Sequence, residues 1–179
     1  MRRLVSIVIV AAGCAVNPNP EPDAATDVVR TVVAPGQAVD LTHQTVIQTQ
    51  EYPATRDQVW GALLASEEDL AMQLHSVDSA RGVVVYRLQA TSPRIAGRHP
   101  STWLDCGRGP DGGPRVNTYQ LTLRMTVVVE PVAERHTRVQ TALVGSAHDR
   151  GVSGDGLPCT SSGQLEKRAL AILAARLAS

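Results

Sequence analysis

Gly107, Gly109 and Gly112 carry a pattern associated with nucleotide binding. The stretch GRGPDGG, residues 107–113, contains a literal Gly-x-Gly-x-x-Gly. A dinucleotide site needs this pattern between a strand and a helix, so that the pyrophosphate meets the helix N-terminus. Here Pro110 lies inside the pattern, Pro114 follows it, and the next expected element is a strand. The chain also lacks the Gly-Lys-Ser/Thr of a P-loop, so we expect no nucleotide site.

A nucleophilic site would have to be built from Cys106 or Ser101, with His99 as the base. No Gly-x-Ser-x-Gly turn is present in the sequence, and no third side chain that would orient the base can be named. The carboxylates at 67–69 are adjacent rather than opposed, which is typical of a solvated helix end. We therefore expect that the protein is not an enzyme.

The histidines do not have the spacing of a metal site. No two of them are four residues apart, and the sequence has no Cys-x-x-Cys pair, so zinc spacing is missing. His148 and Asp149 are adjacent, but they stand where a strand is expected to end and a polar loop to begin. We therefore expect no metal and no other cofactor. The histidines are His43, His75, His99, His136 and His148.

The first 13 residues have the composition of a secretory signal. Arg2 and Arg3 precede a mostly apolar run, residues 4–12, which ends in small residues. As a helix this run would rise only ~14 Å, too little to cross ~30 Å of hydrocarbon. We therefore interpret residues 1–13 as a signal peptide.

The stretch Ala11-Ala12-Gly13-Cys14 resembles the lipobox of bacterial lipoproteins. This resemblance implies that the thiol of Cys14 carries a diacylglycerol, that the chain is cut before it and that the new N-terminus is acylated. The family usually has leucine where this chain has Ala11. Its inner-membrane retention signal would place aspartate where this chain has Ala15. The resemblance therefore implies a location on the periplasmic face of the outer membrane, if the organism has one.

Lipidation of Cys14 would also explain the number of cysteines. The chain has three, an odd number for an exported protein. If Cys14 carries lipid, Cys106 and Cys159 remain, and we expect them to form one disulfide in an oxidising compartment.

Charge and composition limit the class of protein and the domain organisation that the rest of the chain can have. Without residues 1–13 it has 15 basic and 17 acidic residues, a net charge of −2, which argues against a nucleic-acid-binding protein. Residues 14–38 are rich in proline and asparagine, and we interpret them as a flexible, lipid-anchored tether that spans roughly 27 Å. Residues 39–179 suffice for one domain, whose core must be built without phenylalanine.

Apolar periodicity predicts the elements of this domain. The clearest signal is the alternation of apolar and polar residues over 118–130, interrupted only at Val128, which predicts an antiparallel strand with one solvated face. Capping-box patterns, Thr55 with Gln58 and Ser161 with Gln164, predict the starts of two helices. The expected elements are a strand at 44–52, a helix from Thr55 to about Ala65, hairpin strands at 73–78 and 83–90, strands at 118–130 and 137–147 joined by a loop from Pro131, and a helix at 162–178.

The connection at 91–117 is unusually long and holds four prolines and five glycines. Connections beyond ~15 residues are usually functional or held by another constraint. Cys106 can hold this one. We expect Trp103 to cover the core rather than to face a partner, since a single tryptophan usually fills space.

The element order predicts an α+β fold: an antiparallel sheet with a helix after the first strand and a long C-terminal helix. This order resembles helix-grip folds. The stretches EYPATRDQVWGALL and CTSSGQLEKRALAIL are similar to the helix-grip domains of BamC-type lipoproteins of the outer-membrane β-barrel assembly machinery. BamC-type proteins have two such domains, whereas this chain has one.

Together these features predict a membrane-anchored envelope lipoprotein that acts as a non-catalytic interaction or scaffold module. Its expected partners are the membrane, through Cys14, and another envelope protein, and the resemblance to BamC-type lipoproteins suggests a role in outer-membrane assembly. The alternative is a carrier of an apolar small molecule, bound in a pocket between the sheet and the C-terminal helix. These two functions differ in whether the interior is filled or hollow, which the sequence does not decide.

Overall fold

A computed structural model describes residues 46–90, 94–149 and 156–179. The described chain forms one antiparallel sheet with the strand order β2-β3-β5-β6-β7-β4, in which β1 pairs with β6. The elements are β1 (Ile47–Tyr52), α1 (Arg56–Leu64), α2 (Glu67–Leu70), β2 (Gln73–Asp78), β3 (Val83–Ala90), η1 (Pro100–Thr102), β4 (Leu104–Asp105), η2 (Arg115–Asn117), β5 (Gln120–Ala133), β6 (His136–His148), β7 (Leu157–Ser161) and α3 (Gln164–Ala178).

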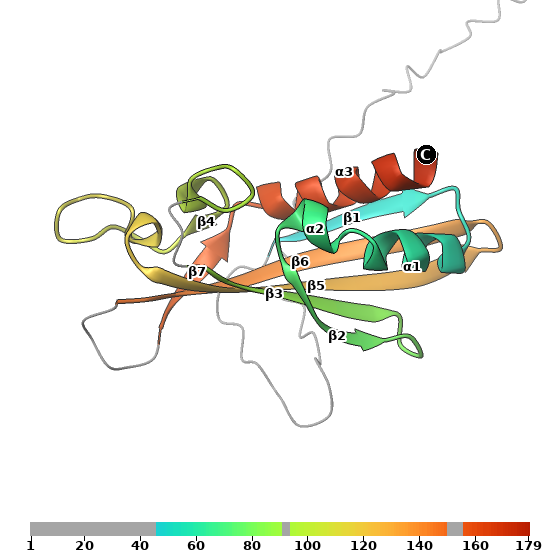
Figure 1. Ribbon diagram of the computed structural model, residues 1–179, viewed down its shortest axis with the longest axis horizontal. Coiled ribbons are helices and arrows are strands. Elements are labelled where there is room, and N and C mark those ends of the chain that lie inside the picture. The colour runs from blue at the N-terminus through green and yellow to red at the C-terminus, as the bar shows by residue number, and fades with distance from the viewer. Residues whose placement is uncertain (1–45, 91–93, 150–155) are drawn as a thin grey trace, which may run out of the picture.

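The three α-helices lie on one side of the sheet, and α3 runs along it above β1 and β6 (Figure 1). This is the predicted α+β arrangement, with a helix after the first strand and a long C-terminal helix, and it has the helix-grip-like form expected from the element order. None of the helices in the described part of the chain is long and apolar enough to cross a membrane.

The core lies between the sheet and the helices. The inward residues of β5 and β6 alternate with half-buried outward residues, because successive side chains of a strand point to opposite faces. The inward face of β5 and the apolar side of α3 belong to one core, and Trp60 packs against the same core. Fully buried core residues include Val59, Tyr86, Leu121, Leu123, Met125, Leu143, Leu165 and Leu173.

The sequence patterns at the first helix and the hairpin are confirmed. Thr55 caps α1, and both bonds of the capping box with Gln58 are present. The strands of the hairpin have the predicted bounds, and Gly82 at φ 70° makes the turn between them. Its carbonyl oxygen accepts a 2.8 Å hydrogen bond from the backbone N–H of Val129, which fixes the turn against β5.

Two boundaries were predicted wrongly. The loop expected from Pro131 does not begin there: β5 continues to Ala133, with an irregular register after Pro131, a position at which a strand tolerates proline. Ser161 does not cap the last helix as expected. Ser161 ends β7, and Gly163, at φ 75° and without a side-chain cap, makes the turn into α3.

Five short elements were not predicted: α2, η1, β4, η2 and β7. Strand β7 pairs with β6 from Gly145 to Ala147, and β4 pairs with β7. The carboxylates at 67–69 form a helix of their own, α2, rather than the solvated end of α1. These elements are too short for a periodic sequence signal.

Candidate functional site

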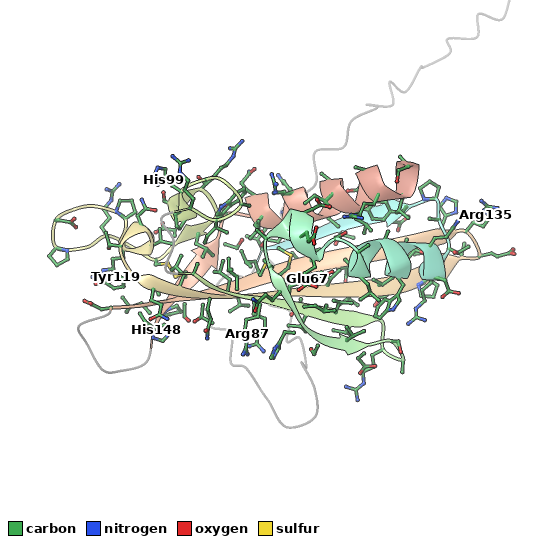
Figure 2. The ribbon with its side chains drawn as sticks, in the orientation of Figure 1. Glu67, Arg87, His99, Tyr119, Arg135 and His148 are labelled. Carbon is green, nitrogen blue, oxygen red and sulfur yellow. A yellow bond between two sulfur atoms is a disulfide. The ribbon has the colours of Figure 1, made fainter. Side chains whose placement is uncertain are left out.

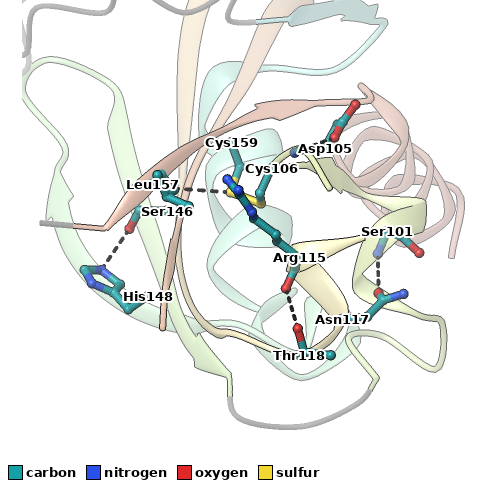
Figure 3. Close-up of a disulfide and its surroundings, with 11 residues drawn as sticks. Ser101, Asp105, Cys106, Arg115, Asn117, Thr118, Ser146, His148, Leu157 and Cys159 are labelled. Atoms are coloured by element: carbon teal, nitrogen blue, oxygen red, sulfur yellow. Dashed lines mark hydrogen bonds between the residues drawn. A yellow bond between two sulfur atoms is a disulfide. The ribbon is translucent and has the colours of Figure 1, made fainter. Parts of the chain in front are cut away.

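Cys106 and Cys159 form the predicted disulfide (Figure 3). Cys106 lies just after β4 and Cys159 lies in β7, so the bond joins the long connection to the strand that leads into α3. Both cysteines are buried. Cys106 therefore has no free thiol with which to act as a nucleophile.

Hydrogen bonds hold the same connection at a second place. The hydroxyl of Ser162 donates to the carbonyl oxygen of Thr102 at 2.8 Å, and the backbone N–H of Ser162 donates to the carbonyl oxygen of Trp103 at 2.9 Å. The indole N–H of Trp103 donates to the carbonyl oxygen of Ile95 at 2.9 Å, and its side chain is buried. Trp103 covers the core, as predicted, and presents no surface to a partner.

The glycine pattern forms a closed loop rather than a phosphate site. The backbone N–H of Gly109 donates to the carbonyl oxygen of Gly113, and the backbone N–H of Gly112 donates to the carbonyl oxygen of Gly109. The backbone N–H of Gly113 donates to the carboxylate of Asp111. Arg108 donates a further bond to the carbonyl oxygen of Gly112. These N–H groups have partners within the loop, and η2 and β5 follow it, so no long helix presents its N-terminus to a ligand.

Three of the other residues considered for chemistry make structural contacts. Glu67 accepts a 3.0 Å hydrogen bond from the backbone N–H of Leu74, and Asp69 pairs with Arg176 at 2.7 Å. The backbone N–H of Ser101 donates to Asn117 at 3.1 Å. Across residues 46–90, 94–149 and 156–179, no group of three or more His, Cys, Asp or Glu side chains could hold a metal ion.

Glu166 is the ionisable group that the sequence analysis missed. It lies in the first turn of α3, its side chain is fully buried, and its Oε1 accepts a 2.6 Å hydrogen bond from the hydroxyl of Ser161. Its Oε2 has no hydrogen-bond partner in the described structure. Burial raises the pKa of Glu166, although the Ser161 hydroxyl and the backbone N–H groups of Glu166 and Leu143 act in the opposite direction.

The register of the sheet explains where this carboxyl group lies. On one edge of β6, β1 pairs as far as Ala142 and β7 pairs from Gly145 onward. Among residues 46–90, 94–149 and 156–179, Leu143 and Val144 therefore have no strand partner on that edge, and Glu166 lies near Leu143. Apolar spacing cannot indicate this position, because the helical pattern of α3 predicts only which side of the helix is buried.

A second candidate is the side of the sheet away from the helices, here called the outer face. On it Arg87 of β3 lies directly opposite Arg124 of β5. Figure 2 shows Arg87 projecting from the sheet on the side opposite the helices. The other outer-face residues of the central strands are Val83, Val85, Gln89, Gln120, Thr122, Thr126, Val128, Glu130, Arg138, Gln140, Ala142, Val144, Ser146 and His148.

Neither Arg87 nor Arg124 is matched by a carboxylate on the neighbouring strands. Gln73 of β2 lies beside Arg87, and Val144 of β6 lies beside Arg124. The sequence pattern did place Arg124 on the solvated side of its strand. Only the pairing of β3 with β5 showed that Arg87 lies next to it.

Cys14 and residues 39–45, at the expected start of the domain, lie outside the described residues. No model of a known protein family matches this chain, and no curated protein matches it.

Several solved structures resemble the chain weakly. Zhui aromatase/cyclase from Streptomyces sp. R1128 is 15% identical with a TM-score of 0.35, over 75% of this chain and 91% of that one. A conserved protein from Geobacillus kaustophilus is 10% identical with a TM-score of 0.34, over 74% and 91%. A TBP-like protein from Parabacteroides distasonis is 7% identical with a TM-score of 0.31. The match covers 64% of this chain and 64% of that protein's length.

Proposed function

We propose that this protein is a membrane-anchored envelope lipoprotein that acts as a non-catalytic interaction or scaffold module. The disulfide between Cys106 and Cys159 carries this proposal. Disulfides persist in oxidising compartments, so the bond supports export. It also uses two of the three cysteines and leaves Cys14, at the junction between the apolar run and the tether, as the one available for lipid.

The proposed location is the periplasmic face of the outer membrane, and the proposed setting is outer-membrane assembly. The lipobox-like stretch before Cys14 supports the location, and the two stretches that resemble BamC-type lipoproteins support the setting. A scaffold role is supported by the structural contacts of the candidate nucleophile and carboxylates and by the unmatched arginines on the outer face.

Fatty-acid labelling and membrane fractionation test the anchor. We expect the wild-type protein to incorporate labelled palmitate and to sediment with membranes, and Cys14→Ser to lose both properties. The matched control is the double variant Cys106→Ser/Cys159→Ser, which retains Cys14 and should still be labelled. A Cys14→Ser variant that stays with membranes, together with an unlabelled wild type, would contradict the proposal.

A carrier of an apolar small molecule is the second candidate function. The buried, unpartnered Oε2 of Glu166 favours it, because a ligand hydroxyl placed between α3 and the sheet would satisfy that oxygen. Native mass spectrometry of the chain from residue 14 onward, with Cys14→Ser, separates the two functions. A reproducible, extractable adduct would support the carrier, whereas an apo mass with a crosslinked envelope protein would support the scaffold.

A further inference from the structure

Arg87 and Arg124 form an unusual pair on the outer face. Residues directly opposite on antiparallel strands have Cβ atoms about 5 Å apart, and like charges at such positions destabilise a sheet. Arg87 is exposed and Arg124 is half-buried. In the part of the chain that the structure describes, neither guanidinium makes a hydrogen bond or ion pair. The pair is therefore available to an anion from outside the domain.

The carboxylates of the outer face lie away from this pair. Asp78 of β2 lies opposite Val83, four residues or about 13 Å along the strand from Arg87, and forms a 3.6 Å ion pair with Arg81. Glu130 is six residues further along β5, about 20 Å from Arg124 at the rise of a strand, which exceeds the screening length of about 8 Å at physiological salt. Glu51 forms a 2.9 Å ion pair with Arg138, which also lies opposite Glu130. A row here means residues that lie directly opposite one another on neighbouring strands. On the other side of the arginine pair, the next two rows across β3, β5 and β6 carry no carboxylate. These rows are Gln89, Thr122 and Ser146, then Gln120 and His148.

Aliphatic side chains adjoin the arginine pair. Val85, Thr126, Ala142 and Ile47 form the next row, from β3 across to β1, and Val85 is buried. Val83 and Val128 are half-buried and lie in the row beyond, between Asp78 of β2 and Gln140 of β6. The face therefore combines a cationic row with neighbouring aliphatic side chains that are partly exposed. This combination fits an amphiphilic anion, whose phosphate meets the guanidinium groups and whose apolar part lies over the valines.

The position of Ile47 links this surface to the anchor. Ile47 begins β1 and lies on the outer face, in the row next to that of Arg87 and Arg124, with β6 between β1 and β5. The first strand therefore begins about 10 Å across the sheet from Arg124, at the spacing of two strands. An anchor on the residues before this strand would hold this face within reach of the bilayer.

We propose that the outer face docks on the anionic phospholipid headgroups of the membrane that holds the anchor, with Arg87 and Arg124 binding phosphate oxygens. The proposal rests on the proposed function, because it takes the membrane of the Cys14 lipid as the partner. Each arginine near an anionic bilayer strengthens binding about fivefold. The anchor supplies the remaining affinity by keeping the domain close to the surface.

Vesicle co-sedimentation of the unlipidated chain tests the docking. The protein is the chain from residue 14 onward with Cys14→Ser, mixed with vesicles of phosphatidylcholine containing phosphatidylglycerol, or of phosphatidylcholine alone. We expect binding only to the anionic vesicles, weakening as salt is added. Arg87→Gln/Arg124→Gln should reduce the partition coefficient roughly 30-fold. Its thermal midpoint should be unchanged or higher, because the substitutions remove a like-charge pair.

Lys167→Gln/Arg168→Gln is the matched control. Both residues are exposed on α3, on the opposite side of the sheet, and their substitution changes the net charge by the same amount. We expect it to leave vesicle binding within about twofold of the wild type, since these charges face away from the docked surface. Equal losses in the two double variants, or equal binding to both kinds of vesicle, would overturn the proposal. If the protein does not bind anionic vesicles but Cys14 is labelled normally, the docking proposal alone is rejected. If it binds anionic vesicles but Cys14 is not labelled, the anchor proposal alone is rejected.

Discussion

The hydroxyl of Tyr52 donates a 2.7 Å hydrogen bond to the carbonyl oxygen of Leu170, 118 residues further along the chain. This buried bond ties the end of β1 to the middle of α3, and burial raises the pKa of Tyr52. Tyr86 makes a similar 2.7 Å bond to the carbonyl oxygen of Leu63, at the last turn of α1. The two tyrosines thus attach the two main helices to the sheet.

Tyr52→Phe should reduce the free energy of unfolding by about 1 kcal/mol, the usual net worth of one hydrogen bond. The aromatic ring stays in the core, so packing is retained. Urea unfolding followed by circular dichroism measures the change. Tyr86→Phe serves as the comparison and should act additively, because the two bonds involve different helices. A double variant as stable as the wild type would contradict these roles.

Loss of the disulfide should destabilise the domain strongly. Cys106→Ser opens a loop whose ends are 53 residues apart, which corresponds to roughly 4 kcal/mol in the chain-entropy model. For a domain of this size we expect the melting temperature to fall by about 10 °C or more. Calorimetry with and without reductant measures the effect. Reductant should lower the melting temperature of the wild type but not that of the variant. Two free thiols in the unreduced, denatured domain would exclude the bond.

Glu166→Gln should change how stability depends on pH. The pKa of Glu166 is raised in the folded state, so its contribution is fully present below the unfolded pKa of about 4.3 and is lost as pH rises through the folded pKa. The variant should match the wild type near that lower pH and become more stable than it as pH rises. Denaturant unfolding across this range measures the difference. Glu68→Gln, on the exposed surface of α2, is the control. A difference between Glu166→Gln and the wild type that does not vary with pH would contradict the expectation.

Gly82→Ala should destabilise the hairpin more than Gly97→Ala. Both glycines have a left-handed backbone, with φ values of 70° and 79°, which costs alanine about 1 kcal/mol. A Cβ on Gly82 would also overlap the carbonyl oxygen of Val129, whereas one on Gly97 would meet nothing within 4 Å. Thermal melts of the two variants measure the contrast. Equal losses of thermal stability in the two variants would show that the close approach of Gly82 to the Val129 carbonyl oxygen has no effect.

The sequence by itself determined the long elements and the class of the fold. The alternation over 118–130 predicted a strand with one buried face, and the capping box at Thr55 predicted the start of α1, because both signals depend on neighbours within one element. The cysteine count, with Cys14 assigned to lipid, predicted the disulfide. The anchor at Cys14 stays a prediction.

Only the tertiary structure decided how these elements meet. Strand β7 has three residues paired with β6 and contains Pro158, so no local pattern distinguished it from a loop. Its register leaves the gap in β6 near which Glu166 lies buried. The pairing of β3 with β5 likewise places Arg87 opposite Arg124, although the two are far apart in the sequence. Strand register depends on contacts between distant segments, and a shift of one residue would move each side chain to the other face.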